Sequence, residues 1–387
     1  MIAKQVLAIL DSREFYGKER ANLLVYEILK KNGLKITVLY NDSASPKLIS
    51  SLNSFNSLAV PFPRMLKGRF LALRYISRFF ATNVIFFYRL VQLKPDFILV
   101  PTEIALSYLI LPLVLTRSKV VFRVGDDPIV LRFKGFIAFA YRFLWRGVMI
   151  KRVNTFVCIT KYIRQSLINS GQTQQNQFRV IYNLPPRVLY ENPGYGIQPK
   201  GSGVIGDHVT FGFIGRVVKE KGVHVLIESA AKLLQEGLKF KIIIAGSLLL
   251  DKNYGEDILR NIAHSSLGEN VVFMDEIEDV GSFYNQIDVL CVPSVYNEPS
   301  GNVIVEAKAY GLPSIIFNLG GMPELVRHLE DGYICDTATP KGLFDAMRFY
   351  LNRPIYIKLH GARAKDSLFR PEFTFSRFES DWLAVFS

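Results

Sequence analysis

Cysteine is scarce in this sequence: Cys158, Cys291 and Cys335 are the three among 387 residues. Each lies in an apolar run, and no pair has the spacing of a metal site. The pattern argues against a disulfide framework. It predicts buried, reduced thiols in a cytoplasmic protein.

Long apolar runs are missing as well. The longest, residues 104–115 and 79–88, are shorter than the roughly 20 residues that a membrane-spanning helix needs. The first residues, MIAKQVLAILDS, lack the apolar core and the cleavage site of a signal peptide. We therefore expect a buried first strand there and no transmembrane helix.

Acidic residues are few in the first half. Residues 1–190 contain 28 Lys and Arg but 9 Asp and Glu, a net charge of +19, whereas residues 191–387 contain 19 and 25, a net charge of −6; the sum is the +13 of the whole chain. A half this basic favours a nucleic acid, an anionic membrane or a phosphorylated acceptor as partner.

Short apolar runs alternate with helical patterns in both halves, which is typical of parallel α/β sheets with right-handed crossovers. Strands are predicted at residues 6–10, 34–40, 97–100, 120–124, 156–159, 209–214, 240–245, 271–274, 289–293 and 314–317. Helices are predicted at residues 18–32, 222–236, 280–285, 302–310 and 341–351.

A stretch rich in Pro and Gly interrupts this alternation after residue 184. We predict an α/β protein of two Rossmann-like domains, residues 1–190 and 206–370, joined by a linker at residues 191–205. Their parallel sheets are expected to face a central cleft, and a C-terminal helix at residues 372–386 is expected to pack back on the first domain.

The first motif that carries chemistry is FGFIGRVVKEKG, where Gly215 and Arg216 directly follow a strand and Lys221 precedes Gly222. Two cations and the positive end of a helix at one turn suit a diphosphate. A solvated basic turn is the alternative interpretation.

The second motif is PSVYNEPSGNVIVEAKAYGLP, in which Glu298 precedes a predicted helix and Glu306 lies about one turn inside it. Gly301 and Asn302 lie at the helix start, where free backbone N–H groups can hold phosphate oxygens. A loop carboxylate can accept hydrogen bonds from sugar hydroxyls, and a helical one can bind a ribose diol. Two surface glutamates are a weaker alternative, because Glu306 lies in an apolar run where an unpaired charge is costly.

These motifs, together with Gly320-Gly321-Met-Pro-Glu324, resemble the donor half of retaining GT-B glycosyltransferases of family four, also called glycosyl transferases group 1. The resemblance covers about residues 205–335. The first half shares three shorter elements with that family: Gly17-x-Glu19, Lys94-Pro95-Asp96 and Ile181-Tyr-Asn183.

The resemblance implies a GT-B fold and an enzyme of the hexosyltransferase type that uses a nucleotide-diphospho-sugar with retention of configuration. Glu298 is the implied contact of the transferred sugar, Glu306 binds the ribose, and the loop 276–278 borders the base. The implied substrate-binding residues are Gly17, Arg216, Lys221, Gly301, Asn302 and Glu306. No cofactor or metal is implied, because cations and a helix dipole stabilise the departing diphosphate.

The sequence departs from the family after the strand VVFRV. The family often has a histidine there, whereas this chain has Gly125, Asp126 and Asp127, and no histidine occurs in residues 1–190. Asp126 is our candidate for a catalytic role in orienting acceptor or sugar, with Asp127 as the weaker one. A capping aspartate is the alternative for Asp126, and no third ligand supports a metal-binding pair.

The basic half contains two stretches without any acid, residues 43–95 and 128–190, which interleave cations with aromatic residues. Lys67, Arg74, Arg78 and Arg89 are spaced for one helical face. Such helices suit an anionic membrane surface, or simply pack one face on the sheet. No nucleic-acid module is present, so a nucleic-acid partner is not expected.

We therefore expect a lipid-linked acceptor or a growing surface glycan, and an enzyme in the cytoplasm, peripheral on the inner face of the cell membrane. A soluble acceptor is the alternative. Two rival functions remain open: a nucleotide-sugar epimerase of the same fold, and a non-catalytic sugar-nucleotide-binding protein.

Overall fold

The chain forms two compact units in a computed structural model that describes residues 3–63, 71–128, 141–171, 177–184, 208–277 and 279–387. The first unit comprises Met1–Asn183 and Ser376–Ser387, and the second comprises Leu184–Phe375. The expected linker at residues 191–205 lies outside the described residues. None of the described helices combines the length and the apolarity needed to cross a bilayer.

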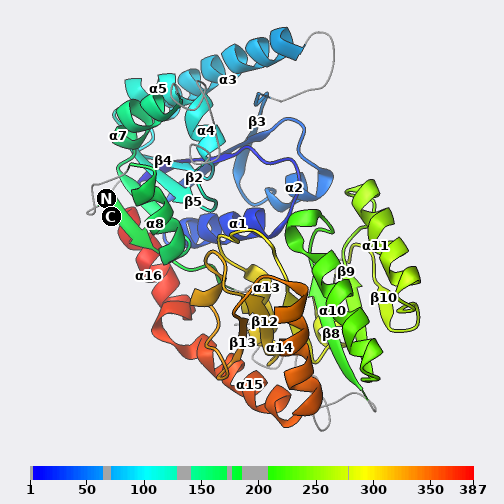
Figure 1. Ribbon diagram of the computed structural model, residues 1–387. Helices are drawn as coiled ribbons and strands as arrows, with labels where there is room; N and C mark the ends of the chain where they lie inside the picture. The colour runs from blue at the N-terminus through cyan, green and yellow to red at the C-terminus, as the bar shows by residue number, and fades with distance from the viewer. Residues whose placement is uncertain (1–2, 64–70, 129–140, 172–176, 185–207, 278) are drawn as a thin grey trace. The chain divides into compact units, whose positions relative to one another are not determined.

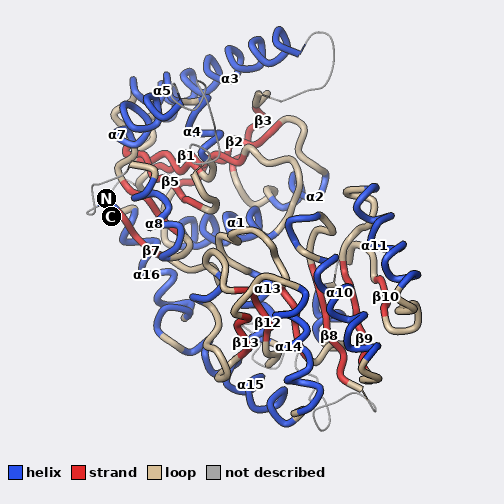
Figure 2. Tube along the Cα trace, in the orientation of Figure 1, coloured by secondary structure: helices blue, strands red, loops and turns tan. Residues whose placement is uncertain are grey.

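The first unit is built on a seven-stranded parallel sheet (Figures 1 and 2). In sheet order the strands are β3 (Asn56–Val60), β2 (Lys35–Asn41), β1 (Gln5–Leu10), β4 (Phe97–Val100), β5 (Lys119–Val124), β6 (Thr155–Cys158) and β7 (Phe178–Val180). Its helices include α1 (Gly17–Lys31), α2 (Pro46–Ser51), α3 (Leu71–Leu93), α4 (Glu103–Tyr108), α5 (Ile110–Leu115), α7 (Ile150–Arg152), α8 (Lys161–Asn169) and α16 (Phe375–Val385).

Two layers of helices cover this sheet. Leu7 and Ile9 of β1 share one buried cluster with side chains of α3, α4, α5 and α8. On the opposite face the Tyr26 hydroxyl of α1 donates to the Ile9 carbonyl at 3.1 Å. Figure 1 shows α3 and α5 on one side of the sheet and α1 on the other. Because both faces are covered, the strands are continuous apolar runs, as in FILV of β4.

Helix α16 returns the end of the chain to the first unit. The Phe386 ring lies 5.1 Å from the Phe97 ring of β4, and the Phe386 carbonyl accepts a hydrogen bond from Lys4 Nζ at 3.0 Å. Asn32, at the end of α1, donates to Glu379 at 2.9 Å. The buried Trp382 ring stacks with Phe386.

The second unit is a six-stranded parallel sheet. In sheet order its strands are β10 (Val271–Phe273), β9 (Phe240–Ala245), β8 (Val209–Ile214), β11 (Val289–Val292), β12 (Ser314–Phe317) and β13 (Gly332–Cys335). Its helices include η4 (Lys219–Lys221), α10 (Val223–Gln235), α11 (Lys252–His264), α12 (Val280–Tyr284), α13 (Asn302–Ala309), η5 (Met322–Glu324), α14 (Pro340–Asn352) and α15 (Ile355–Asp366).

The prediction of two Rossmann-like domains with parallel sheets is confirmed. Sequence patterns missed β3, β7 and β13, and they placed the helix after β8 one residue early. Residues 219–221 form a separate 3-10 turn before α10, because Gly222 adopts a left-handed conformation with φ of 72° between the two.

Candidate functional site

The loops that follow β8 and β11 meet at the carboxyl edge of the second sheet, where parallel α/β folds bind ligands. Gly222 makes this approach possible: a Cβ atom on it would lie 1.9 Å from the Pro293 carbonyl oxygen, so no larger residue fits. The Val295 N–H also donates to the Glu220 carbonyl at 2.9 Å. The turn after β8 is thereby fixed against the loop after β11.

This contact places Lys221 beside Glu298. Lys221 Nζ lies 2.6 Å from Glu298 Oε2 and 3.3 Å from the Tyr296 hydroxyl, and it stands over the Tyr296 ring. The Ser294 hydroxyl donates to the same carboxylate oxygen at 3.1 Å. Both charged side chains are largely buried, 21% and 14% exposed, which strengthens their attraction over that of a surface pair.

A third loop, after β12, fixes the backbone of Glu298. Gly321 N–H donates to the Glu298 carbonyl at 2.7 Å. Gly320 has a φ of 61°, and a Cβ atom on it would lie 2.1 Å from the Glu298 carbonyl oxygen. Only glycine satisfies both the conformation and the contact. Glu298 is therefore held through its main chain as well as its carboxylate.

Arg216 lies at the start of the turn after β8 and is exposed. Within the part of the chain that the structure describes, its side chain forms no ion pair or hydrogen bond. Glu298 already neutralises Lys221, whereas the Arg216 guanidinium has no carboxylate partner among the described residues.

Helix α13 begins after Gly301, which has no side chain to offer, so the first N–H groups of the helix have no side-chain cap. Glu306 is buried at 5% exposure, and the Tyr284 hydroxyl donates to its Oε2 at 2.9 Å. Tyr284 in turn stacks on Tyr310 at 4.9 Å. The Glu306 carboxylate is therefore already partnered, and it is less open than the sequence indicated.

A buried charge network that sequence reasoning missed anchors the far end of α13. Lys308 Nζ pairs with Asp331 at 2.8 Å and donates to the Ser367 hydroxyl at 2.8 Å. Arg370 reaches the same Asp331 carboxylate at 3.2 Å. Burial lowers the pKa of Lys308, and the Asp331 carboxylate opposes that shift. Two features of the sequence could have indicated this network: Lys308 lies inside an apolar run, and Asp331 directly precedes a glycine.

In the first unit, Gly17 begins α1, and Glu19 two residues later has a structural role. Buried Glu19 accepts hydrogen bonds from the Ser12 hydroxyl at 2.5 Å and from the Tyr16 N–H at 3.1 Å. These contacts close the loop between β1 and α1, as in a capping box.

Arg123 of β5 is a second buried charge that the sequence analysis did not single out. It donates to Asn22 of α1 and, at 2.6 Å, to Asn183 of the Ile181-Tyr-Asn183 motif. Burial lowers the pKa of Arg123 to about 10, while Tyr26 and Glu19 oppose the shift. The motif that closes the first domain is thus tied to its centre.

The two aspartates after β5 differ in their surroundings. Asp127 accepts hydrogen bonds from the Tyr162 hydroxyl at 2.7 Å and from the Ser166 hydroxyl at 2.6 Å, both on α8. Asp126 is exposed. Asp127 is therefore occupied in holding α8, and Asp126 is the more exposed of the two.

The prediction that four cations share one exposed helical face needs correction for Arg78. Arg78 is turned towards the protein, where it donates to the Phe62 carbonyl at 2.9 Å and pairs with Asp42 at 2.5 Å. Arg89 donates to Gln92 at 2.6 Å. Lys67 lies outside the described residues, as does Glu278 of the loop expected to border a base.

The second half of the chain is similar in sequence to known glycosyltransferases. A family model described as "Glycosyl transferases group 1" matches residues 197–365. The capsular polysaccharide biosynthesis glycosyltransferase CapM of Staphylococcus aureus is 26% identical over 223 residues, 57% of this chain and 57% of that protein. The N-acetyl-alpha-D-glucosaminyl L-malate synthase of Bacillus anthracis is 24% identical over 230 residues, 58% of each chain. This chain thus spans somewhat more than half the length of these relatives.

Solved structures are similar over nearly the whole chain. Anabaena HepE in complex with UDP-glucose has a TM-score of 0.76 at 17% identity, with 99% of both chains covered. WaaG, a glycosyltransferase involved in lipopolysaccharide biosynthesis, has a TM-score of 0.68 at 16% identity, covering 98% of this chain and 99% of that one. The chain therefore has the fold of GT-B glycosyltransferases, and its residues 197–365 match the group 1 glycosyl transferases.

Proposed function

We propose that this protein is a retaining glycosyltransferase of family four that transfers a sugar from a nucleotide-diphospho-sugar to an acceptor. The observation that carries the proposal is the Lys221–Glu298 pair, fixed by glycines from two loops, within the segment that matches group 1 glycosyl transferases. HepE, a protein of the same fold, has been solved with UDP-glucose.

The donor diphosphate would lie between the turn after β8 and the start of α13. Arg216 offers an uncompensated guanidinium, and the backbone N–H groups of Gly301 and Asn302 lie where a helix attracts anions. Lys221 would supply the second cation. Such groups stabilise the negative charge that develops on a departing nucleoside diphosphate. We propose that no metal is needed for this step.

Lys221 can serve the diphosphate only by changing partners. Its ammonium now lies 2.6 Å from Glu298, and a diphosphate carries more negative charge than one carboxylate. Phosphate binding would draw Lys221 away and release Glu298 Oε2, which Ser294 also contacts. The freed carboxylate could then accept hydrogen bonds from hydroxyls of the transferred sugar. Donor binding and sugar recognition would thus be coupled through one side chain.

The remaining roles follow from position. Glu306, which accepts a hydrogen bond from Tyr284, would bind the ribose diol. In the first domain, Gly17 would allow an acceptor close to the start of α1, and exposed Asp126 would orient the acceptor or the sugar. Capping of the following segment is the alternative for Asp126.

We further propose a lipid-linked acceptor or a growing surface glycan, reached at an anionic membrane. Helix α3 supports this with an exposed apolar stripe, here named the α3 ridge: Ile76, Phe80, Val84, Phe87, Tyr88 and Val91. Monomeric soluble proteins rarely expose so continuous an apolar surface without a partner. Cations beside such a stripe are typical of peripheral membrane helices.

The activity is tested by incubating the protein with a panel of nucleotide-sugars, with and without lipid-linked acceptors. Transfer of sugar to an acceptor supports the proposal. Conversion of the donor to an epimer without any acceptor would instead identify the rival epimerase. Binding without either reaction would favour a non-catalytic protein.

Arg216→Ala and Lys221→Ala should each weaken nucleoside diphosphate binding. Loss of a charge-assisted phosphate contact costs about 1.5–3 kcal/mol, or roughly 10- to 100-fold in Kd. Calorimetric titration with the diphosphate that best stabilises the wild type measures this. Lys219→Ala is the matched control, because it removes an exposed cation from the same turn. Equal affinity in all three variants would contradict the diphosphate assignment.

The position of Glu298 should control turnover. Glu298→Gln is expected to lower kcat by roughly 10²-fold, because an amide stabilises developing charge less well than a carboxylate. Gly320→Ala should have a similar effect without altering Glu298 itself, because its Cβ would displace the Glu298 carbonyl. Steady-state kinetics on folded protein measure both.

Gly237→Ala is the control for backbone strain. Gly237 has a φ of 73°, close to that of Gly320, but open space around its Cβ position. It should lose stability without losing kcat. If Gly237→Ala and Gly320→Ala lose turnover equally, the positioning of Glu298 is not the cause.

Transfer activity should persist after dialysis against EDTA. The cations Arg216 and Lys221 and the start of α13 are proposed to perform the work of a metal. Activity is measured before and after chelation, and again after adding back Mg²⁺ or Mn²⁺. Complete loss that a divalent ion restores would overturn the metal-free proposal.

The protein should sediment with anionic liposomes at low salt and less at high salt, because attraction to anionic lipid is screened within a Debye length. Each cation near the surface contributes about 1 kcal/mol. The triple change Lys67→Gln, Arg74→Gln and Arg89→Gln should therefore weaken binding. Arg78→Gln should mainly lower stability, because Arg78 pairs with Asp42. A wild type that stays in the supernatant would favour a soluble acceptor.

A further inference from the structure

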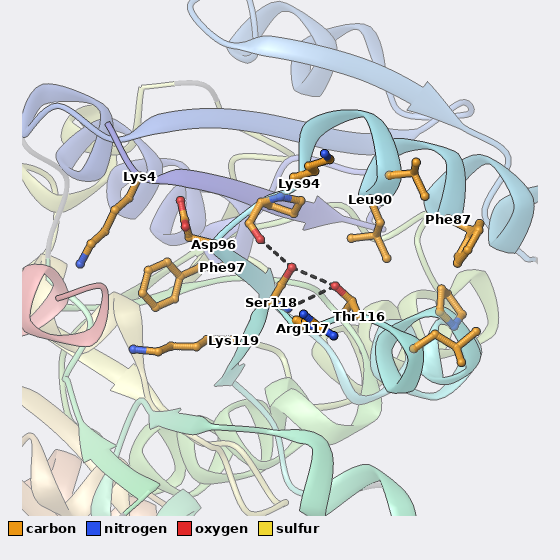
Figure 3. A pocket seen from close by; sticks show the side chains of 14 residues that line it. Lys4, Phe87, Leu90, Lys94, Asp96, Phe97, Thr116, Arg117, Ser118 and Lys119 are labelled. Atoms are coloured by element: carbon orange, nitrogen blue, oxygen red, sulfur yellow. Dashed lines mark hydrogen bonds between the residues drawn. The ribbon is translucent and has the colours of Figure 1, made fainter. Parts of the chain in front are cut away.

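A groove of about 610 Å³ opens on the first domain between α3, α5 and the amino ends of β4 and β5 (Figure 3). Its volume lies within the roughly 300–1,000 Å³ typical of small-molecule sites. The carboxyl ends of the same strands, where Asp126 lies, are at the opposite edge of the sheet. The groove is therefore separate from the edge at which α/β proteins carry out chemistry.

One end of the groove is apolar. It is lined by Phe87, Leu90 and Val91 of α3 and by Pro112 and Leu115 of α5. Phe87 and Val91 also belong to the α3 ridge, and Leu115 is 73% exposed. The α3 ridge and the apolar end of the groove thus share Phe87 and Val91.

The rest of the lining is cationic. Lys94, Arg117 and Lys119 belong to it, on different sides of the groove (Figure 3), and all three are exposed without an ion pair to any described residue. Lys4 and Lys119 flank the Phe97 ring, at 5.7 and 5.4 Å from its centre (Figure 3). The one acid in the lining, Asp96, accepts the Gln5 N–H at 2.7 Å. The cations therefore have no carboxylate partner in the groove and can attract an anion.

Lys94 has an unusual backbone conformation. It directly follows α3 with a φ of 43°, a left-handed conformation that favours glycine after a helix. Its N–H donates to the Leu90 carbonyl at 3.0 Å, which closes the helix. A lysine at this position accepts backbone strain that a glycine would avoid.

We infer that this groove binds one anionic phospholipid of the bilayer, its phosphate near Arg117, with Lys94 and Lys119 adding positive charge around it, and the start of an acyl chain against Phe87, Val91 and Leu115. The apolar end gives a soluble phosphate nothing to contact, whereas an acyl chain gains free energy by leaving water there. The groove holds the headgroup and the first part of a chain, and the remainder extends along the α3 ridge. This site is independent of the proposed glycosyl transfer.

The test uses a short-chain lipid below its critical micelle concentration, so that membrane docking plays no part. Dihexanoyl phosphatidylglycerol is titrated into the full-length protein by calorimetry, with glycerol 3-phosphate and dihexanoyl phosphatidylcholine in parallel. We expect saturable 1:1 binding of the anionic lipid, at least tenfold tighter than either of the other two compounds. Equal binding of glycerol 3-phosphate would show a plain phosphate site and overturn the proposal.

Variants locate the site. Arg117→Gln combined with Lys119→Gln should weaken binding at least tenfold, whereas Lys31→Gln combined with Lys151→Gln, with the same change in net charge, should not. Leu115→Ser should also weaken it, with Leu249→Ser, at an exposed position of the second domain, as its control. If the groove variants and their controls bind alike, the assignment is wrong.

Lys94→Gly separates binding from folding. Glycine fits the left-handed conformation, so this variant should melt at the same or a higher temperature while binding the lipid more weakly. Unchanged affinity in Lys94→Gly would remove Lys94 from the site. No binding of the lipid to the wild type would overturn the proposal and leave the transferase activity untouched.

Discussion

The ion pair between Lys221 and Glu298 is the contact to which the surrounding loops of the second domain are fitted. Gly222 brings the lysine against the backbone of Pro293, and Gly320 holds the backbone of Glu298. A largely buried pair pays a desolvation cost that offsets most of its attraction, so stability alone is a weak reason to retain it. The arrangement suits the proposed site, in which a stronger anion would replace the carboxylate.

Much of the fold was predictable because central parallel strands are apolar on both faces. The bounds expected at residues 97–100, 209–214, 240–245 and 314–317 agree with β4, β8, β9 and β12. The missed strands, β3, β7 and β13, are all at sheet edges. An edge strand such as NSLAV is partly exposed and carries no continuous apolar run, so its sequence resembles that of a loop.

For the site, the sequence identified residue types but not partners. It assigned Lys221 to the phosphates and Glu298 to the sugar. In the structure the two side chains contact each other, although they lie 77 positions apart in the sequence. Nothing local indicates that Tyr284 bonds Glu306 or that Asp331 pairs with Lys308. Helical spacing likewise grouped Arg78 with other cations but could not tell which face packs on the sheet. Burial of Thr82, Phe86 and Leu90 turns Arg78 inward and leaves an apolar ridge outside.

The charges of the first half are also distributed unevenly between the two edges of its sheet, which the net value of +19 conceals. Seven of its nine acidic residues lie in the loops or first helical turns after strands: Asp11, Glu14, Glu19, Asp42, Glu103, Asp126 and Asp127. Carboxylates there are stabilised by the positive ends of helices. Lys4, Lys94, Arg117 and Lys119 line the groove at the opposite edge, where Asp96 is the one acid. A domain polarised in this way can hold an anionic lipid at its basic edge, because cations attract that lipid while the carboxylates of the opposite edge repel it.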